Sequence, residues 1–193
     1  MRAITRNTAI QVYKVIFSYM IDHAEDFTSE DGAPCLIAPG RETIIAHINR
    51  PLDDIEQLLN ISPLGNGAME SYVRQLVYGE NIDGFEYTYW ERIHRWEYGD
   101  TGVMNQEKWM IKKLTENTNT RRSVSILWNP ENDVCSKHPP CLNHIKLNIW
   151  KESLNMTALF RSHDLIGGWI PNVYAIIHLI NKLAEELGLY PGW

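Results

Sequence analysis

The chain has 193 residues, of which 44% are hydrophobic and 22% are charged, as in ordinary globular domains. It lacks the roughly 20 consecutive apolar residues of a spanning helix, which argues against a membrane protein. Its net charge of −6 argues against a nucleic-acid binder with a broad basic surface. The length predicts a single domain covering residues 1–193.

Hydrophobic spacing and turn residues define the expected elements of the first half. Apolar residues at helical spacing alternate here with Gly-, Pro- and Asp-rich segments that predict turns. In chain order we expect a helix over 8–24, a loop over 26–40, a strand over 44–48, a short helix over 53–59, and a helix over 68–78 that Gly79 ends.

The second half shows the clearer patterns. We expect a helix over 105–116, a strand over 123–128, a hairpin of strands 145–150 and 154–161, and a helix over 172–187. Asn172 can cap that last helix, and Gly188 can end it. The order predicts an α+β fold: a mixed, largely antiparallel sheet flanked by helices.

Cys141 is the first candidate for chemistry. It follows Pro139 and Pro140, whose rings fix two backbone angles, so its side chain is expected on a rigid corner before a strand. That placement suits a nucleophile whose direction matters. A buried structural cysteine explains the same pattern equally well.

The same segment allows a metal site. Cys135, His138, Cys141 and His144 are spaced by three, and all four are possible zinc ligands. The two prolines stiffen the loop that would wrap the metal, and His144 begins a strand, so we expect no metal. Three cysteines and an N-terminus without a signal sequence favour a reducing compartment, and hence the cytoplasm.

Local arginine clusters are candidates for binding an anion. Arg121 and Arg122 precede a strand, and Arg161 stands beside Ser162 at the end of another. Guanidinium and hydroxyl groups bind phosphate well. A solvated surface pair and a structural turn are the alternatives. The Asn172 amide offers a donor and an acceptor, and could therefore read a base edge as well as cap a helix.

These segments together resemble thymidylate synthase. Residues 121–128 are similar to the family's Arg-Arg strand, 139–141 to its catalytic Pro-Cys, 160–164 to its Gln-Arg-Ser-x-Asp element, and 168–174 to its Gly-x-Pro-Phe-Asn-x-x-x-Tyr run. Residues 84–89 are similar, more loosely, to the stretch that carries the family's active-site tyrosine. The order and spacing agree over about residues 105–193.

The resemblance implies methylation of dUMP to dTMP, with methylenetetrahydrofolate or a related reduced pterin as the one-carbon donor. Cys141 would add to C6 of the pyrimidine, and Asn172 would pair with the uracil edge. Arg161 and Ser162 would hold the phosphate, with Arg41 a weaker candidate. The sheet face would form a homodimer interface, across which the partner's Arg121 and Arg122 would reach the same phosphate.

Further roles follow from the resemblance. Tyr89 and Asp164 would order water near C5, and Glu70 (with Glu80 as the alternative) would assist proton transfer. Asp164 would also contact the pterin, beside Gly168 and Trp169. The chain departs from the family pattern at Leu142, where a histidine is common, and at Phe160, where a glutamine is common.

Three alternatives stay open. A sister enzyme would trap the C5 methylene with water and give a hydroxymethyl pyrimidine nucleotide. A catalytically inactive nucleotide-binding dimer and a small zinc module are the other two. The ending at Trp193 predicts that this chain lacks the family's C-terminal ribose-binding motif and the tail that closes over the cofactor.

Overall fold

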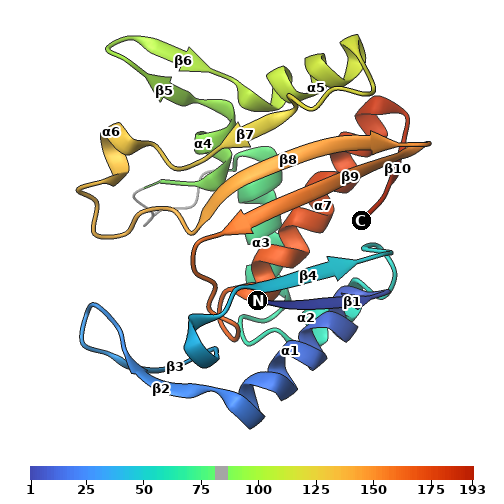
Figure 1. The fold of residues 1–193 in the computed structure, drawn as a ribbon. Helices are drawn as coiled ribbons and strands as arrows, with labels where there is room; N and C mark the ends of the chain where they lie inside the picture. Colours follow the sequence, from blue (N-terminus) through green and yellow to red (C-terminus); the bar gives the residue numbers. More distant parts are fainter. Residues whose placement is uncertain (81–86) are drawn as a thin grey trace. The chain divides into compact units, whose positions relative to one another are not determined.

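The computed structural model describes residues 1–80 and 87–193 (Figure 1). The described chain divides into two compact units. The first contains residues 1–58 and Trp193, and the second contains residues 59–192. The expectation of one domain is not tested by this division and stays a prediction.

In the first unit, a helix connects two parallel strands. Strand β1 (Arg2–Arg6) pairs in parallel with β4 (Ile44–Ile48), and α1 (Ala9–His23) follows β1. A side of α1 that includes Ile10, Val12 and Ile16 is buried. The predicted helix over 8–24 and strand over 44–48 are confirmed.

The prediction of a loop over residues 26–40 is wrong for most of that segment. Strands β2 (Glu25–Thr28) and β3 (Pro34–Ile37) form an antiparallel hairpin there, followed by a 3-10 turn, Pro39–Arg41. The Gly- and Asp-containing residues that predicted a loop lie at the hairpin tip, where Gly32 has φ = +79°. The short helix expected over 53–59 is found as α2 (Glu56–Ile61).

The second unit is built on a four-stranded sheet in the order β10-β9-β8-β7. Strands β7 (Val124–Ile126), β8 (Leu142–Trp150) and β9 (Ser153–Phe160) are antiparallel, and β10 (Tyr190–Pro191) pairs in parallel with β9. The predicted hairpin is confirmed, and its tight turn places Lys151 at φ = +56°.

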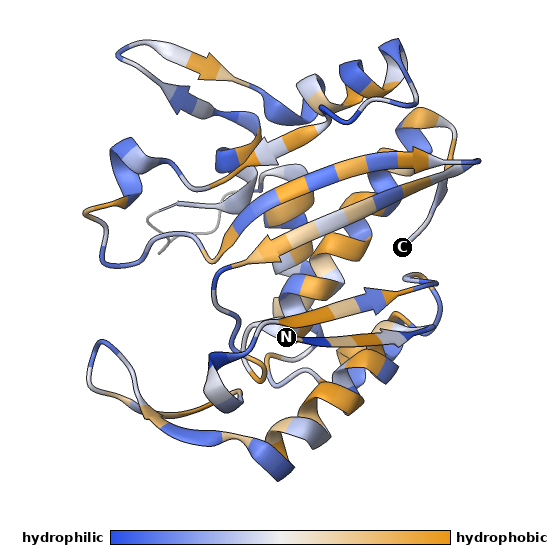
Figure 2. Ribbon diagram, viewed as in Figure 1, coloured by the Kyte–Doolittle hydropathy of each residue, from blue (hydrophilic) through white to orange (hydrophobic). Residues whose placement is uncertain are grey.

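One face of this sheet packs on helices and the other is open. Ile145, Leu147 and Leu154 are buried, and α7 (Trp169–Leu187) lies behind β8 and β9. Figure 2 shows hydrophobic and hydrophilic residues alternating along these two strands. That alternation places one set of side chains against the helices and the other set on the open face.

The other elements of this unit surround the sheet. They are α3 (Asn66–Val73), which continues as a π-helical turn Arg74–Tyr78, α4 (Tyr89–His94), the hairpin of β5 (Trp96–Tyr98) and β6 (Gly102–Met104), α5 (Gln106–Glu116) and α6 (Pro130–Asp133). Gly79 ends the π-helical turn in the left-handed conformation, as predicted.

The long C-terminal helix differs from its prediction at one end. Gly188 ends α7 in the left-handed conformation, as predicted, but the helix begins at Trp169. Asn172 therefore lies in the first turn, not at the cap, and its amide is free to contact other groups. Among the described residues, no helix is long and apolar enough to cross a membrane.

Candidate active site

Arg161 holds the corner that carries Cys141. Its Nε donates to the carbonyl oxygen of Pro140 at 3.1 Å, and its Nη2 donates to that of Pro139 at 2.8 Å. Its backbone N–H donates to the carbonyl oxygen of Cys141 at 2.9 Å. The two proline rings restrict the backbone angles of this corner, and the planar guanidinium binds both proline carbonyls. The backbone that carries the partly exposed cysteine is thereby restrained.

Tyrosine hydroxyls surround this corner. The backbone N–H of Leu142, the residue after the cysteine, donates to the hydroxyl oxygen of Tyr89 at 3.3 Å. Burial raises the pKa of Tyr72, Tyr87 and Tyr89, and the charge of the nearby Cys141 sulfur raises each pKa further. The three hydroxyls therefore stay protonated at neutral pH.

Asn172 lies between two partners. The Tyr72 hydroxyl donates to Oδ1 of Asn172 at 2.6 Å, and Nδ2 of Asn172 lies 3.0 Å from Nε2 of His163. The imidazole of His163 stacks on Phe160, with ring centroids 4.1 Å apart. Burial lowers the pKa of His163 to about 4, so the ring is neutral at physiological pH.

A buried ion pair ties α4 to the loop before the cysteine. Arg92 Nη2 lies 2.6 Å from Asp133 Oδ1, and these side chains are 15% and 2% exposed. The second carboxylate oxygen of Asp133 accepts from the backbone N–H of Asn129 at 2.7 Å. Because α4 begins at Tyr89, this pair fixes the helix that brings Tyr89 to the corner.

Comparisons with known proteins bear on this arrangement. Residues 70–193 match the family model described as "Thymidylate synthase". A *Methanocaldococcus jannaschii* protein is 33% identical over 158 residues, covering 79% of this chain and 68% of that protein. A *Methanopyrus kandleri* protein is 29% identical over 187 residues, covering 95% and 84%. Both carry the name "Putative thymidylate synthase".

The chain belongs to the thymidylate synthase family. A *Methanococcoides burtonii* relative of the same printed name is 37% identical over 124 residues, which cover 64% of this chain and 55% of that protein. The chain thus spans about half the length of that curated relative. The sequence-based recognition of the family is confirmed.

Four residues predicted from the thymidylate synthase resemblance lie on connected elements. Arg161 and Tyr89 contact the backbone on either side of Cys141, and Asn172 shares the partner Tyr72 with this cluster. Ser162, next in the chain to Arg161, is exposed. The contacts therefore connect Arg161 and Tyr89 to the backbone around Cys141, and the binding roles predicted for these residues stay predictions.

The predicted pterin contacts follow in the chain. Asp164 is exposed, and its Oδ1 accepts from the backbone N–H of Ile166 at 2.9 Å. A Cβ at Gly167 would come within 2.7 Å of the other carboxylate oxygen, so a larger residue there would displace the Asp164 side chain. Gly168 is half-buried, and Trp169 is only 6% exposed. The pterin contacts of Asp164, Gly168 and Trp169 stay predictions.

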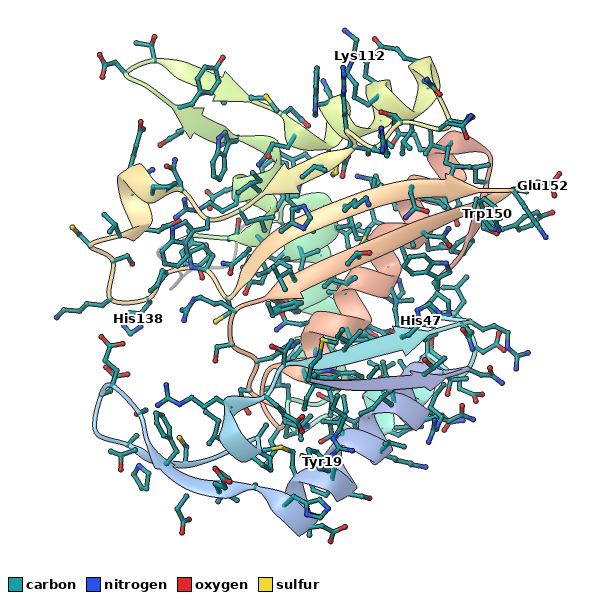
Figure 3. The ribbon with its side chains drawn as sticks, in the orientation of Figure 1. Tyr19, His47, Lys112, His138, Trp150 and Glu152 are labelled. Atoms are coloured by element: carbon teal, nitrogen blue, oxygen red, sulfur yellow. The ribbon has the colours of Figure 1, made fainter. Side chains whose placement is uncertain are left out.

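Arg121 and Arg122 lie far from the cysteine of the same chain. Strand β7 pairs with β8 through Val124 opposite Lys146, and this register continues to Ser123, whose carbonyl accepts from Leu147 N–H. The arginine pair therefore lies near position 148, about 23 Å along β8 from Cys141 at ~3.3 Å per residue. Figure 3 labels two residues for orientation: His138, which precedes the cysteine in the chain, and Trp150, at the far end of β8.

Glu70 and Arg41 are not among the contacts of this cluster. Glu70 is exposed on α3, two residues from Tyr72, and lines a shallow hollow of about 220 Å³ with Val73, Arg74, Tyr174 and His178. Glu80 pairs with Arg74 at 2.9 Å. Arg41 belongs to the first unit, where its guanidinium lies 4.3 Å from the Phe27 ring centroid. The roles of these residues stay predictions.

Sequence reasoning missed Tyr72, His163 and Arg92. His163 lay inside the recognised 160–164 motif, but its contact with Asn172 depends on the turn between β9 and α7. Tyr72 is distant in sequence from Asn172, and only the fold brings them together. The part of the predicted tyrosine-bearing stretch at residues 84–86 lies outside the described residues.

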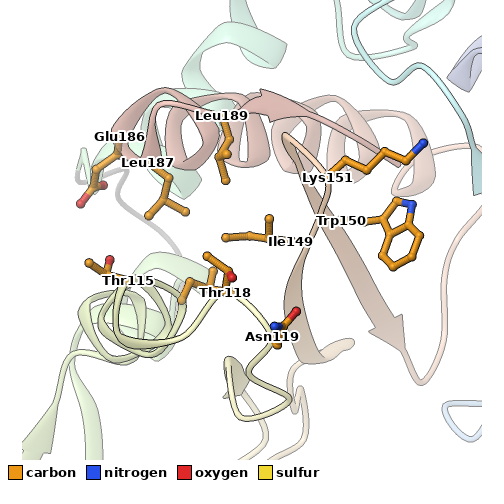
Figure 4. A pocket seen from close by; sticks show the side chains of 10 residues that line it. Thr115, Thr118, Asn119, Ile149, Trp150, Lys151, Glu186, Leu187 and Leu189 are labelled. Atoms are coloured by element: carbon orange, nitrogen blue, oxygen red, sulfur yellow. The ribbon is translucent and has the colours of Figure 1, made fainter.

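Two further features concern a metal site and a surface hollow. Among the described residues, no group of three His, Cys, Asp or Glu side chains is arranged to hold a metal, and the four residues of the zinc alternative form no such group. A hollow of about 550 Å³ lies between the end of α5, the end of β8 and the end of α7 (Figure 4). It contains none of the predicted site residues.

Proposed function

We propose that the chain transfers a one-carbon unit to C5 of dUMP, giving dTMP, through covalent addition of Cys141 to C6. The observation that carries this proposal is the corner at Cys141, which Arg161 braces and whose charge acts on Tyr72, the hydroxyl partner of Asn172. Family membership supports the same chemistry. A reduced pterin such as methylenetetrahydrofolate supplies the one-carbon unit.

The residues of the chain have distinct tasks in this proposal. The Cys141 thiolate adds to C6, which places negative charge on C5 and O4 and makes C5 the nucleophile. Protonated tyrosine hydroxyls nearby can donate to that developing charge, or to a water that does so. C5 would then bond to the methylene carbon of the reduced pterin and lose its proton, and the carbon–nitrogen bond to the pterin would break. Hydride from the released tetrahydropterin, which becomes a dihydropterin, would reduce the methylene to a methyl group as the thiolate leaves C6. Asp164 faces the pterin.

Arg161 has two tasks because of its position. Two of its N–H groups are used on the proline carbonyls, and the remaining N–H groups can bind a phosphate with Ser162. Phosphate binding is therefore coupled to the geometry of the cysteine corner. A bound dianion would tighten the guanidinium that fixes the nucleophile.

We propose that the phosphate site is completed in a homodimer. The Arg121–Arg122 pair lies about 23 Å along β8 from Cys141 of its own chain, so a second chain is needed to bring the pair there. The open sheet face supports such an assembly. Ile126, Leu159 and Trp150 are 51%, 52% and 68% exposed on it, and Ile126, His144 and Leu159 form one cross-strand row.

The test is incubation with 5-fluorodeoxyuridylate and methylenetetrahydrofolate. The fluorine cannot leave as the C5 proton does, so the expected result is a covalent ternary adduct on Cys141, located by mass spectrometry of peptides. Cys141→Ser should form none, while Cys135→Ser should form it normally. Nucleotide binding without an adduct would contradict the enzyme proposal and favour an inactive binder. Product analysis with dUMP separates methyl from hydroxymethyl transfer.

A further inference from the structure

His163 is the group that orients the Asn172 amide. The two partners of this amide differ in kind. The Tyr72 hydroxyl can donate or accept, so it tolerates either end of the amide. The imidazole nitrogen 3.0 Å away on the other side has one role at a time, set by the tautomer. The tautomer of His163 therefore decides which way the amide points.

The surroundings of His163 select one tautomer. Nδ2 of Asn172 can only donate, so the Nε2 that lies 3.0 Å from it must accept. The proton of the neutral ring is then on Nδ1. The neutral ring then presents an unprotonated Nε2, which accepts from the Nδ2 of Asn172 and places Oδ1 toward Tyr72. The stack on Phe160 holds the plane of the ring.

The orientation of the amide determines which hydrogen-bonding groups it presents to a ligand. One lone pair of Oδ1 and one hydrogen of Nδ2 are left for a ligand. Uracil offers a donor at N3 and an acceptor at O4, whereas cytosine offers an acceptor at N3 and a donor at its 4-amino group. An amide rotated by 180° exchanges its donor and acceptor, and would therefore suit cytosine as well as the observed orientation suits uracil.

We propose that His163 is a specificity-determining positioning residue, whose ring fixes the Asn172 amide in the orientation that accepts a uracil edge and rejects a cytosine edge. This inference rests on the proposed function, because it assumes that Asn172 contacts the base. It assigns the discrimination between uracil and cytosine to His163 and Asn172 together. Phe160, which departs from the family pattern, acts here as the support of the imidazole.

The test compares binding of dUMP and dCMP by calorimetry. Wild type should prefer dUMP, and His163→Phe, which keeps an aromatic ring on Phe160 but removes the acceptor, should lower the dUMP/dCMP preference about ten- to a hundredfold. His163→Gln, which can accept from Asn172, should recover part of it. The exposed His138→Gln is the matched control and should keep the wild-type preference.

The outcomes separate the two levels of the argument. If folded His163→Phe binds both nucleotides more weakly by the same factor, the residue is merely structural and the inference is overturned. If wild type binds neither nucleotide, the proposed function fails, and the specificity inference fails with it. A third readout needs neither nucleotide nor variant: the ¹⁵N shifts of His163 should report a neutral ring protonated at Nδ1. An Nε2–H tautomer would overturn the inference.

Discussion

The Nη2 of Arg161 donates to the carbonyl oxygen of Pro139 at 2.8 Å, while its Nε donates to the next carbonyl along the chain. One side chain thus spans two consecutive peptide units immediately before Cys141. This bond pair links the residue expected to bind phosphate with the direction of the nucleophile.

Replacing Arg161 with lysine should therefore slow covalent chemistry while keeping the positive charge. A single ammonium cannot reproduce the planar fork, so the corner loses one of its two restraints. We expect adduct formation with 5-fluorodeoxyuridylate to slow by about 10- to 100-fold, since misplacement of a reacting group is costly. Stopped-time mass spectrometry measures this rate. Arg50→Lys, at an exposed ion pair in the first unit, is the control, and an equal rate in both variants would contradict the prediction.

The Arg92–Asp133 pair should show strong thermodynamic coupling. Either Arg92→Met or Asp133→Asn leaves its partner unpaired, and we expect a loss of about 3–5 kcal/mol from the free energy of unfolding. The double variant should lose less than the sum, with a coupling energy of about 1–3 kcal/mol. Urea unfolding of the four proteins measures it.

The exposed pair of Arg74 and Glu80 is a matched comparison, because these side chains are 45% and 58% exposed. We expect a coupling energy of about 1 kcal/mol or less for that pair, since water screens it. Equal coupling in the two cycles would show that burial does not strengthen the Arg92–Asp133 interaction.

Glu107 should make the free energy of unfolding depend on pH. Burial acts to raise its pKa, but hydrogen bonds from His94 and Lys182 outweigh burial and hold the pKa below the ordinary value of 4.5. The stabilisation is then fully present above that ordinary pKa and is lost as pH falls through the lower pKa of the folded state. Glu107→Gln should flatten the stability profile in that acidic range, whereas the exposed Glu152→Gln should leave its slope unchanged.

Mixed dimers should recover activity that neither parent has. Under the proposed shared phosphate site, Arg121→Ala damages the partner's site and Cys141→Ala damages its own. A mixture re-equilibrated in mild denaturant should contain dimers with one intact site, approaching a quarter of wild-type activity for random pairing. Activity no higher than the average of the parents would refute the shared site. Mixing Arg161→Ala with Cys141→Ala is the control, because both changes fall on the same chain's site and no recovery is expected.

The sequence predicted the elements whose patterns are long or repeated. The period-two alternation of the β8–β9 hairpin and the apolar spacing of α7 are local signals, and both elements are confirmed. The hairpin of β2 and β3 was mistaken for a loop because its short strands carry few buried side chains, so the tip dominated the pattern. The start of α7 was placed too late, since Asn172 is also a good cap.

The residues of the site also divide into those that local sequence predicts and those that only the fold brings together. Cys141, Arg161 and Asn172 stand in motifs that can be recognised along the chain. Tyr72 and His163 are parts of the site only because α3 and the turn after β9 meet at the Asn172 amide, and no local spacing encodes that meeting. Burial, which lowers the pKa of His163 and raises that of Tyr72, is likewise a property of the packed fold.

The length of strand β8 determines the distance between the cysteine corner and the arginine pair, because the two lie near opposite ends of this strand. Its length therefore constrains the protein more tightly than the identity of most of its residues. Inserting one residue would exchange the faces of everything beyond it, burying Lys146 and exposing Leu147. Inserting two residues would preserve the faces but would move the arginine pair by about 7 Å relative to the cysteine corner. That shift is larger than the N–O distance of a salt bridge. Substitutions on this strand should therefore be tolerated more easily than insertions.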